Sequence, residues 1–187
     1  MGPYIAIFTE WLGNLININV DKHPFIGGIV ISVSMGMFLT LPISSAAIGI
    51  MLGLSGLASG AATIGCCCQM VGFAVMSFKE NKVGGLISQG IGTSMLQMPN
   101  IIRHPQIWIP PILSSAILAP VSTMVFKMVS NPVGSGMGTS GLVGQFSAYA
   151  VMVGAGTHPA TAVIQIMAMH FILPALVTYV IAYGMRK

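Results

Sequence analysis

The fold is decided by residues 56–78, which read GLASGAATIGCCCQMVGFAVMSF. This stretch contains no Asp, Glu, Lys or Arg, and it lies in a charge-free window that extends from residue 23 to residue 78. A helix that crosses a bilayer needs about 20 largely apolar residues, so this window is long enough for two crossings. Three more charge-free windows follow, at 83–102, 104–126 and 128–185. The pattern predicts an all-α, polytopic integral membrane protein.

The composition excludes the other classes of protein. The chain has 187 residues, of which 55% are apolar and 5% are charged, and its mean hydropathy is +0.89. Soluble domains carry about 25% charged residues, so neither a water-soluble globule nor a disordered chain fits. The basic residues stand near segment ends, so the net charge of +4 marks topology rather than nucleic-acid binding. The lipid bilayer is the expected surrounding.

A single membrane domain over residues 1–187 accounts for these windows. Glycine-rich backbone is tolerated at membrane depth only where it is buried in protein or lines a wet cavity, so two such segments are expected to re-enter on the side they came from. The expected segments are an amphipathic or first helix at 1–20, a helical hairpin at 24–78, a re-entrant segment at 83–102, a helix at 106–127, a glycine-rich re-entrant segment at 130–157 and a helix at 159–185.

The basic residues give an expected orientation. Two crossings within 24–78 would place Lys22 on the same side as Lys79 and Lys82. Cytoplasmic loops carry an excess of Lys and Arg, so this side is predicted to be cytoplasmic. Arg103 and the C-terminal Arg186-Lys187 would share that side, and Lys127 would lie outside.

The two glycine-rich segments carry the same motif. Residues 90–96 read GIGTSML and residues 136–142 read GMGTSGL, both of the form Gly-x-Gly-Thr-Ser-x-Leu. A His-Pro pair follows each motif, at His104-Pro105 and at His158-Pro159. Paired, glycine-interrupted hydrophobic segments indicate a transporter binding site. We therefore expect the two motifs to approach each other inside the membrane.

The candidate binding residues follow from this pair. Hydroxyl and amide side chains can hydrogen-bond a neutral polar solute, and they cost free energy in hydrocarbon unless they are paired. The predicted substrate-binding residues are Thr93, Ser94, Gln97, Asn100, Thr139, Ser140, Gln145 and His158.

Each candidate also has a structural interpretation. The glycines can serve helix packing while Thr and Ser cap short helices, and the amides, Gln69, Gln89 and Gln165 among them, can pair with one another or with backbone. His158 precedes a proline at an expected helix start, so capping and ligand contact are equally good interpretations. Both remain open at this point.

The sequence indicates no metal, cofactor or catalytic centre. Cys66, Cys67 and Cys68 are consecutive, so they cannot close one tetrahedral site on a helix. They are typical of packing residues, with acylation or redox sensing as the alternatives. The 15 methionines are scattered along the chain and do not predict a copper path. Because no nucleophile stands with a base, we expect a transport subunit rather than an enzyme.

Several stretches together resemble a known family, the IIC membrane domain of the bacterial phosphotransferase system, and within it the subgroup that includes membrane regulators of toxin genes. The similar stretches are LPISSAA at 41–47, GFAVMSFK at 72–79, GIGTSMLQMPN at 90–100, IPP at 109–111 and MGTSGLVGQ at 137–145. The chain looks like the C-terminal half of such a domain or a short member.

The resemblance implies a helical permease in the bacterial cytoplasmic membrane that binds a sugar, which a separate IIB protein phosphorylates. We also expect a homo-oligomer such as a dimer, or pairing with another membrane half, which fits the short length. Glu10, in Thr9-Glu10-Trp11, does not match the Glu motif of better-studied IIC domains. The alternatives are a membrane-embedded sensor of the same fold that transports nothing, and a structural half that needs a partner subunit.

Overall fold

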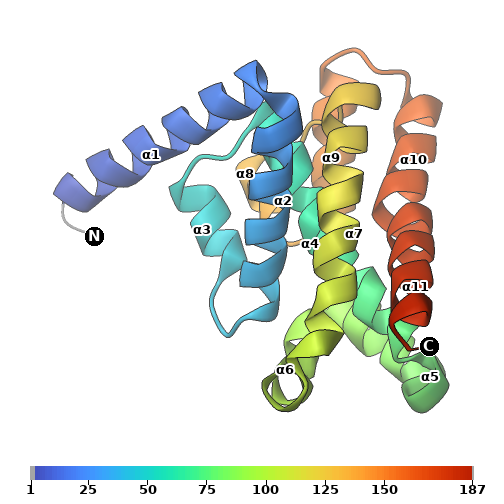
Figure 1. The fold of residues 1–187 in the computed structure, drawn as a ribbon. Helices are drawn as coiled ribbons and strands as arrows, with labels where there is room; N and C mark the ends of the chain where they lie inside the picture. Colours follow the sequence, from blue (N-terminus) through green and yellow to red (C-terminus); the bar gives the residue numbers. More distant parts are fainter. Residues whose placement is uncertain (1–2, 187) are drawn as a thin grey trace.

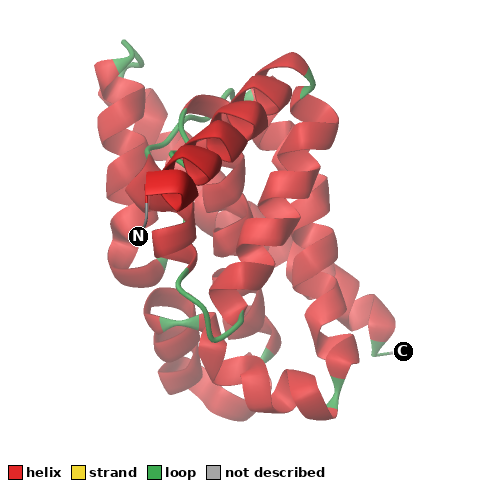
Figure 2. Cartoon of the chain, turned by 90° about the vertical axis from the view of Figure 1, so that its left-hand side faces the viewer, coloured by secondary structure: helices red, strands yellow, loops and turns green. Residues whose placement is uncertain are grey.

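The computed structural model describes residues 3–186, and the side chains from residue 7 onward. The membrane domain predicted over residues 1–187 includes residues 1, 2 and 187, which lie outside the described residues. Within residues 3–186 the chain forms helices and no strand, apart from an isolated backbone bridge between Gly56 and Ser130 (Figure 2). The all-α prediction is confirmed.

The longer helices form the body of the molecule. They are α1 (Pro3–Lys22), α2 (Pro24–Thr40), α4 (Gly56–Met76), α5 (Phe78–Ile87), α7 (Ile109–Pro120), α9 (Val143–Gly154), α10 (Pro159–Met167) and α11 (Leu173–Met185).

Short helical turns connect or extend these helices. They are α3 (Ser45–Met51), η1 (Ser88–Gly92), η2 (Ser94–Gln97), α6 (Met98–Arg103), η3 (Pro105–Trp108), η4 (Val121–Val125), α8 (Pro132–Ser135), η5 (Ser140–Leu142) and η6 (Ala168–Ile172). Among the described residues, three continuous helical stretches are long and apolar enough to cross a membrane: Gly56–Met76, Pro105–Val125 and Pro159–Met185.

Helix α4 lies at the centre of the bundle, and 94% of its most apolar 18-residue stretch is buried. It packs against α2, α7 and α11 (Figure 1). Close approach explains its small residues: a Cβ at Gly65 would overlap the carbonyl oxygen of Ser32 in α2, and a Cβ at Gly60 would overlap that of Met128. Inside a membrane the hydrophobic effect contributes little to helix association, and small residues favour it by letting the helix backbones approach closely.

Helices α2 and α4 run parallel, which corrects the predicted hairpin over 24–78. Ser32 lies against Gly65, and the Thr40 hydroxyl lies 3.4 Å from Gln69 Oε1, so both helices advance in the same direction. The chain returns between them through α3 and residues 52–55, where Gly53 and Gly56 adopt positive φ of 58° and 56°. Glycine takes this conformation without steric cost, which permits the turns that bracket the return.

The parallel arrangement also corrects the expected sides of the basic residues. Lys22 ends α1 at the end of the bundle opposite α5 and α6 (Figure 1). Lys127 shares the end of Lys22, because the nearby Thr123 hydroxyl donates to the carbonyl oxygen of Pro24 at 2.9 Å. The α5/α6 end carries Lys79, Lys82, Arg103 and Arg186. The expectation that Lys22 shares a side with Lys79 and Lys82 is therefore wrong.

The two glycine-rich segments enter the bundle from opposite ends. Residues 83–102 begin and finish at the α5/α6 end, while Ser94 reaches inward to contact Thr40 of α2. Residues 130–157 begin at the other end, where Ser130 bonds to Gly56, descend beside α4 to Thr139 and return as α9. That these segments re-enter a bilayer remains a prediction.

Helix α1 projects away from the bundle (Figure 1). Polar contacts join its C-terminal part to the bundle, where Asn17 donates to the carbonyl of Gly53 and accepts from the amide of Ser55. Phe8, Trp11 and Ile18 are exposed, and so is Glu10. The exposed apolar side chains suit contact with lipid or with another protein chain.

Candidate functional site

The two Gly-x-Gly-Thr-Ser-x-Leu motifs contact each other, as the sequence predicted. The hydroxyl of Thr139 donates a hydrogen bond to the carbonyl oxygen of Gly90, and the hydroxyl of Ser140 donates to that of Gly92 at 2.9 Å. Both acceptors belong to the first motif and both donors to the second. We call this pair of hydrogen bonds the clasp.

The backbone is constrained beside the clasp. Gly138 and Gly141 both have φ of 53°, and Leu142 has φ of 60°. A non-glycine residue in the left-handed region costs about 1–2 kcal/mol, so the surrounding contacts must hold Leu142 in place. Gly144 contributes one of these contacts through its amide, which donates to the carbonyl of Gly138 at 3.1 Å.

The clasp uses two of the predicted binding residues for contacts within the protein. Thr139 is buried and also lies 3.4 Å from the sulfur of Met70. Thr93 accepts a 3.2 Å hydrogen bond from the amide of Met95 and so caps η2. In this structure Thr93, Thr139 and Ser140 therefore have the structural roles that the sequence left as the alternative.

Gln97 and Asn100 belong to a row of hydrogen-bonded side chains. The amide nitrogen of Asn100 donates to Gln97 Oε1 at 2.9 Å, and Gln97 Nε2 donates to Gln89 Oε1 at 2.8 Å. The hydroxyl of Ser77 also donates to Gln89 Oε1, at 3.3 Å. Gln89 and Gln97 are buried, whereas Asn100 is exposed. The row thus leads from the surface to the interior.

This row borders a cavity at the α5/α6 end of the bundle, which we call the polar cavity. Its volume is about 330 Å³, at the lower end of the range of about 300–1,000 Å³ that is usual for small-molecule sites. Its charged groups are one carboxylate, Glu80, and one guanidinium, Arg186. The lining residues are Phe73, Met76, Ser77, Glu80, Asn81, Gln97, Asn100, His104, Ile107 and Arg186.

A second group of polar side chains, the inner cluster, lies one helical turn deeper on α4. Ser94 and Thr40 have their hydroxyl oxygens 3.0 Å apart, and Gln69 Oε1 accepts from the Thr40 hydroxyl at 3.4 Å and from the Trp108 indole at 3.1 Å. Gln69 is fully buried, and its Nε2 has no hydrogen-bond partner. An unpaired buried donor costs free energy, so Gln69 is suited to an acceptor supplied by a solute or by water.

Gln145 and His158 lie elsewhere in the bundle. Gln145 Nε2 lies 3.0 Å from His170 Nδ1, and its buried Oε1 has no partner. His170 stands on the π-helical turn η6, a feature that is frequent at functional sites. His158 is exposed and its Nδ1 accepts from the amide of Ala160 at 3.3 Å, so it caps α10. Neither residue lines the polar cavity.

Sequence reasoning missed several residues of this region. Asn81 and Glu80 line the polar cavity, and Thr40 and Trp108 belong to the inner cluster. A tryptophan in an apolar window needs an acceptor for its indole N–H, so Trp108 was a usable signal although it is only partly buried. Thr40 offered no such signal in the sequence, because its contact with Ser94 depends on how α2 packs against η2.

The cysteines have the packing role that the sequence favoured. All three are buried, and the Cys66 thiol lies 3.5 Å from the carbonyl of Met35 and 3.6 Å from that of Ser135. Within residues 3–186 no three His, Cys, Asp or Glu side chains are grouped so that they could hold a metal ion.

Comparison with known proteins identifies a family. The family model described as "Phosphotransferase system, EIIC" matches residues 1–187. No curated protein and no solved structure matches the chain.

Proposed function

Because the chain belongs to the EIIC family of the phosphotransferase system, we propose that it binds and translocates a sugar or a similar neutral polar solute, which a separate IIB protein phosphorylates. The family makes the chain a membrane permease component. The nature of the solute and the coupling to IIB are the parts that we propose.

The polar cavity is the observation that carries this proposal. Its amide side chains can both donate to and accept from hydroxyl groups. Glu80 and Arg186 bring one negative and one positive charge, so the cavity has no excess charge that would favour an ion. We assign direct solute contacts to Gln97 and Asn100, which line the cavity and were predicted from the sequence.

The orientation of the cavity suits the proposed coupling. Lys79, Lys82, Arg103 and Arg186 lie at the α5/α6 end, against Lys22 and Lys127 at the other end. The excess of basic residues supports our proposal that the α5/α6 end faces the cytoplasm, in a multi-pass arrangement in the bacterial cytoplasmic membrane. The polar cavity then opens toward the cytoplasm, where a IIB protein would meet the bound solute.

The other predicted binding residues keep a proposed role farther along the path. Ser94 belongs to the inner cluster, where the unpaired nitrogen of Gln69 would donate a hydrogen bond to the solute before the solute reaches the polar cavity. Thr139 and Ser140 would shape the path by holding the clasp, and Thr93 by capping η2 beside it. Gln145 and His158 would contact the solute nearer the opposite end.

Binding by the full chain in detergent tests this proposal, with a panel of neutral hexoses, hexitols and disaccharides. We expect one class to bind saturably and Gln97→Leu to weaken its binding at least tenfold, because two hydrogen bonds of the row are lost. Gln106→Leu, on an exposed residue outside the polar cavity, is the matched control. Absence of saturable binding to the folded chain, or equal loss in both variants, would contradict the proposed site.

Uptake separates transport from sensing. Right-side-out vesicles and whole cells that contain the complete phosphotransferase system should accumulate the phosphorylated form of the solute that binds. Binding without accumulation would instead support the alternative, a membrane-embedded sensor of the same fold.

The exposed apolar residues of α1 favour an oligomer. Phe8 and Trp11 are 58% and 59% exposed although their rings lie only 6.2 Å apart, so together they form an apolar patch on the projecting helix. We propose that this helix packs against a second copy or another membrane half. Cross-linking of Trp11→Cys chains in vesicles, compared with the exposed Thr161→Cys, tests this contact.

A further inference from the structure

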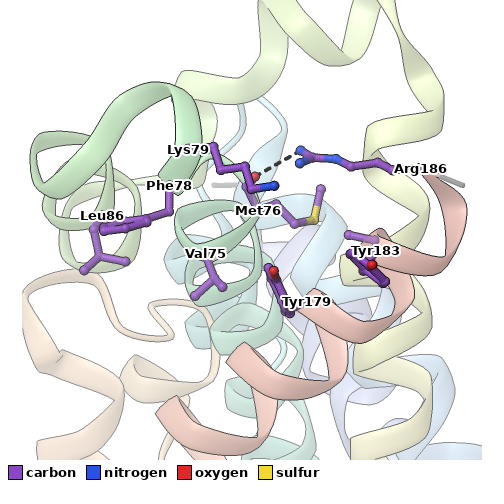
Figure 3. Close-up of a pocket in the computed structure, with 9 residues that line it drawn as sticks. Val75, Met76, Phe78, Lys79, Leu86, Tyr179, Tyr183 and Arg186 are labelled. Carbon is purple, nitrogen blue, oxygen red and sulfur yellow. Dashed lines mark hydrogen bonds between the residues drawn. The ribbon is translucent and has the colours of Figure 1, made fainter.

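An apolar trough lies beside the polar cavity, on the outer surface of the bundle. It has a volume of about 310 Å³ and lies between the end of α4, the start of α5 and the last turns of α11 (Figure 3). Val75, Leu86, Tyr179 and Tyr183 form its walls. Leu86 is 38% exposed and Tyr179 43% exposed, so the trough is open to the surroundings of the bundle. Such walls suit a hydrocarbon chain rather than a sugar.

The two tyrosines are stacked along the trough. Their ring centroids are 6.4 Å apart and their planes are inclined by 22°. Tyrosine is enriched where the membrane meets water, because its ring is apolar and its hydroxyl is polar. The two tyrosines therefore suit a position where acyl chains meet headgroups.

Two cations flank one end of the trough. Figure 3 shows Lys79 and Arg186 on the same side, beyond Val75 and the tyrosines. Arg186 Nη2 donates to the carbonyl of Met76 at 3.1 Å, which fixes the guanidinium against the end of α4. A guanidinium has five N–H groups, and this bond uses one of them. Both side chains are exposed, so an anion can reach them from the surface.

The nearby acidic side chain does not line this trough. Glu80 follows Lys79 in the chain but borders the polar cavity. The other two acidic residues of the chain, Glu10 and Asp21, belong to α1. The charges that line the trough are thus positive, and they stand where an apolar wall begins.

We infer that the trough binds one anionic phospholipid, with its phosphate between Lys79 and Arg186 and an acyl chain along Val75, Leu86 and Tyr179. The match of charge and of apolar surface selects a lipid over a second protein chain. Basic pockets between membrane helices on the cytoplasmic side bind anionic headgroups in the same way. This inference does not depend on the identity of the solute.

The site also touches the polar cavity, because Met76 and Arg186 line both. A phosphate bound to Arg186 would hold the C-terminal turn of α11 beside α4. The lipid would thereby stabilise one wall of the polar cavity.

Native mass spectrometry of the full chain in detergent tests this inference. The probes are phosphatidylglycerol, phosphatidylcholine with the same acyl chains, and inorganic phosphate. We expect phosphatidylglycerol to bind more tightly than phosphatidylcholine and inorganic phosphate not to displace it. Lys79→Gln and Arg186→Gln should each weaken binding of phosphatidylglycerol about fivefold and weaken binding of phosphatidylcholine less, because choline already offsets the charge of its phosphate. Arg103→Gln, at the same end but outside the trough, is the matched control.

Several outcomes would overturn the site. Equal affinity for the two lipids, or an equal loss of phosphatidylglycerol binding in Arg103→Gln and Lys79→Gln, would contradict the site. Either result would indicate nonspecific attraction of anionic lipid to the basic α5/α6 end. Displacement by inorganic phosphate would indicate a free anion as the ligand. If Arg186→Gln fails to fold, Lys79→Gln decides alone, because the Lys79 side chain is exposed. Tyr179→Ser provides a second readout, since loss of an apolar wall should weaken binding of both lipids.

Discussion

The hydroxyl of Ser140 donates a 2.9 Å hydrogen bond to the carbonyl oxygen of Gly92, two residues that are 48 positions apart in the chain. Together with the bond from Thr139 to Gly90, it joins the tips of two segments that enter the bundle from opposite ends. The clasp thus ties the polar cavity side of the bundle to the opposite side.

Removal of one clasp bond should destabilise the protein modestly. We expect Ser140→Ala to lower the free energy of unfolding by about 0.5–1.5 kcal/mol, the usual net contribution of one hydrogen bond. Thr139→Val should cost more, because Thr139 is buried and the bond to Gly90 lies in the interior. Thermal unfolding in detergent measures both, with Thr161→Val on the exposed face of α10 as the control. Identical melting temperatures for Thr139→Val and Thr161→Val would contradict the clasp.

The inner cluster should behave as one coupled unit. Gln69→Leu removes the acceptor of the partly buried Trp108 indole, which should cost about 1 kcal/mol. The Thr40 hydroxyl keeps contacts with Ser94 and with the carbonyl oxygen of Gly36, so it should add little to this cost. In Trp108→Phe the indole donor is absent, so Gln69→Leu should cost less on that background. A double-mutant cycle by chemical unfolding should give a coupling above about 0.5 kcal/mol.

The other tryptophan of the chain is the control for this cycle. Trp11 is 59% exposed on α1, so Trp11→Phe should show no coupling to Gln69→Leu. Additivity of Gln69→Leu with Trp108→Phe would show that the indole does not depend on Gln69.

The close packing of α4 against α2 should make Gly65 intolerant of any side chain. A Cβ there would meet backbone atoms of Ser32 rather than a flexible side chain. We therefore expect Gly65→Ala to lower the free energy of unfolding by about 1–3 kcal/mol, as overpacking does. Gly154→Ala, where a Cβ would meet nothing within 4 Å, should be neutral or slightly stabilising. Similar stability of the two variants would mean that α2 and α4 lie farther apart.

The corrected arrangement of the basic residues can be checked by labelling. On a background with Cys66, Cys67 and Cys68 replaced by Ala, Lys22→Cys and Lys127→Cys should react with an impermeant maleimide from one side of the membrane. Arg103→Cys should react from the other side only. The reason is that α2 and α4 are parallel, which separates Lys22 from the α5/α6 end. Labelling of Lys22→Cys and Arg103→Cys from the same side would restore the hairpin that the sequence suggested.

The helical membrane class could be predicted because lipid replaces water around the whole chain. Ten charged residues cannot cover a soluble surface, and the gaps between them have the length of membrane helices. The contact between Thr139 and Gly90 could also be anticipated, since the same motif occurs twice.

The direction of α4 could not be predicted in this way. A charge-free window does not reveal whether residues 41–55 cross the membrane or only turn back within the bundle. The outcome depends on the close approach of Gly65 to Ser32 and on the turns at Gly53 and Gly56. The same holds for the candidate site. The amide of Gln97 in an apolar window indicated a polar path, whereas Thr40 acquires its role only from the packing of α2 against η2.

The central position of α4 has a consequence for how the protein is made. Ser59 donates to the carbonyl of Asn131, Thr63 lies 3.2 Å from that of Gly134, and Gln69 accepts from Trp108. Each of these three partners is synthesised after α4, so the helix enters the membrane before they exist, although Thr40 of α2, which also donates to Gln69, has already been made. Its neighbours in that interval are lipid tails or the insertion machinery. The final helix arrangement must therefore form by rearrangement after insertion, once the second glycine-rich segment has been made.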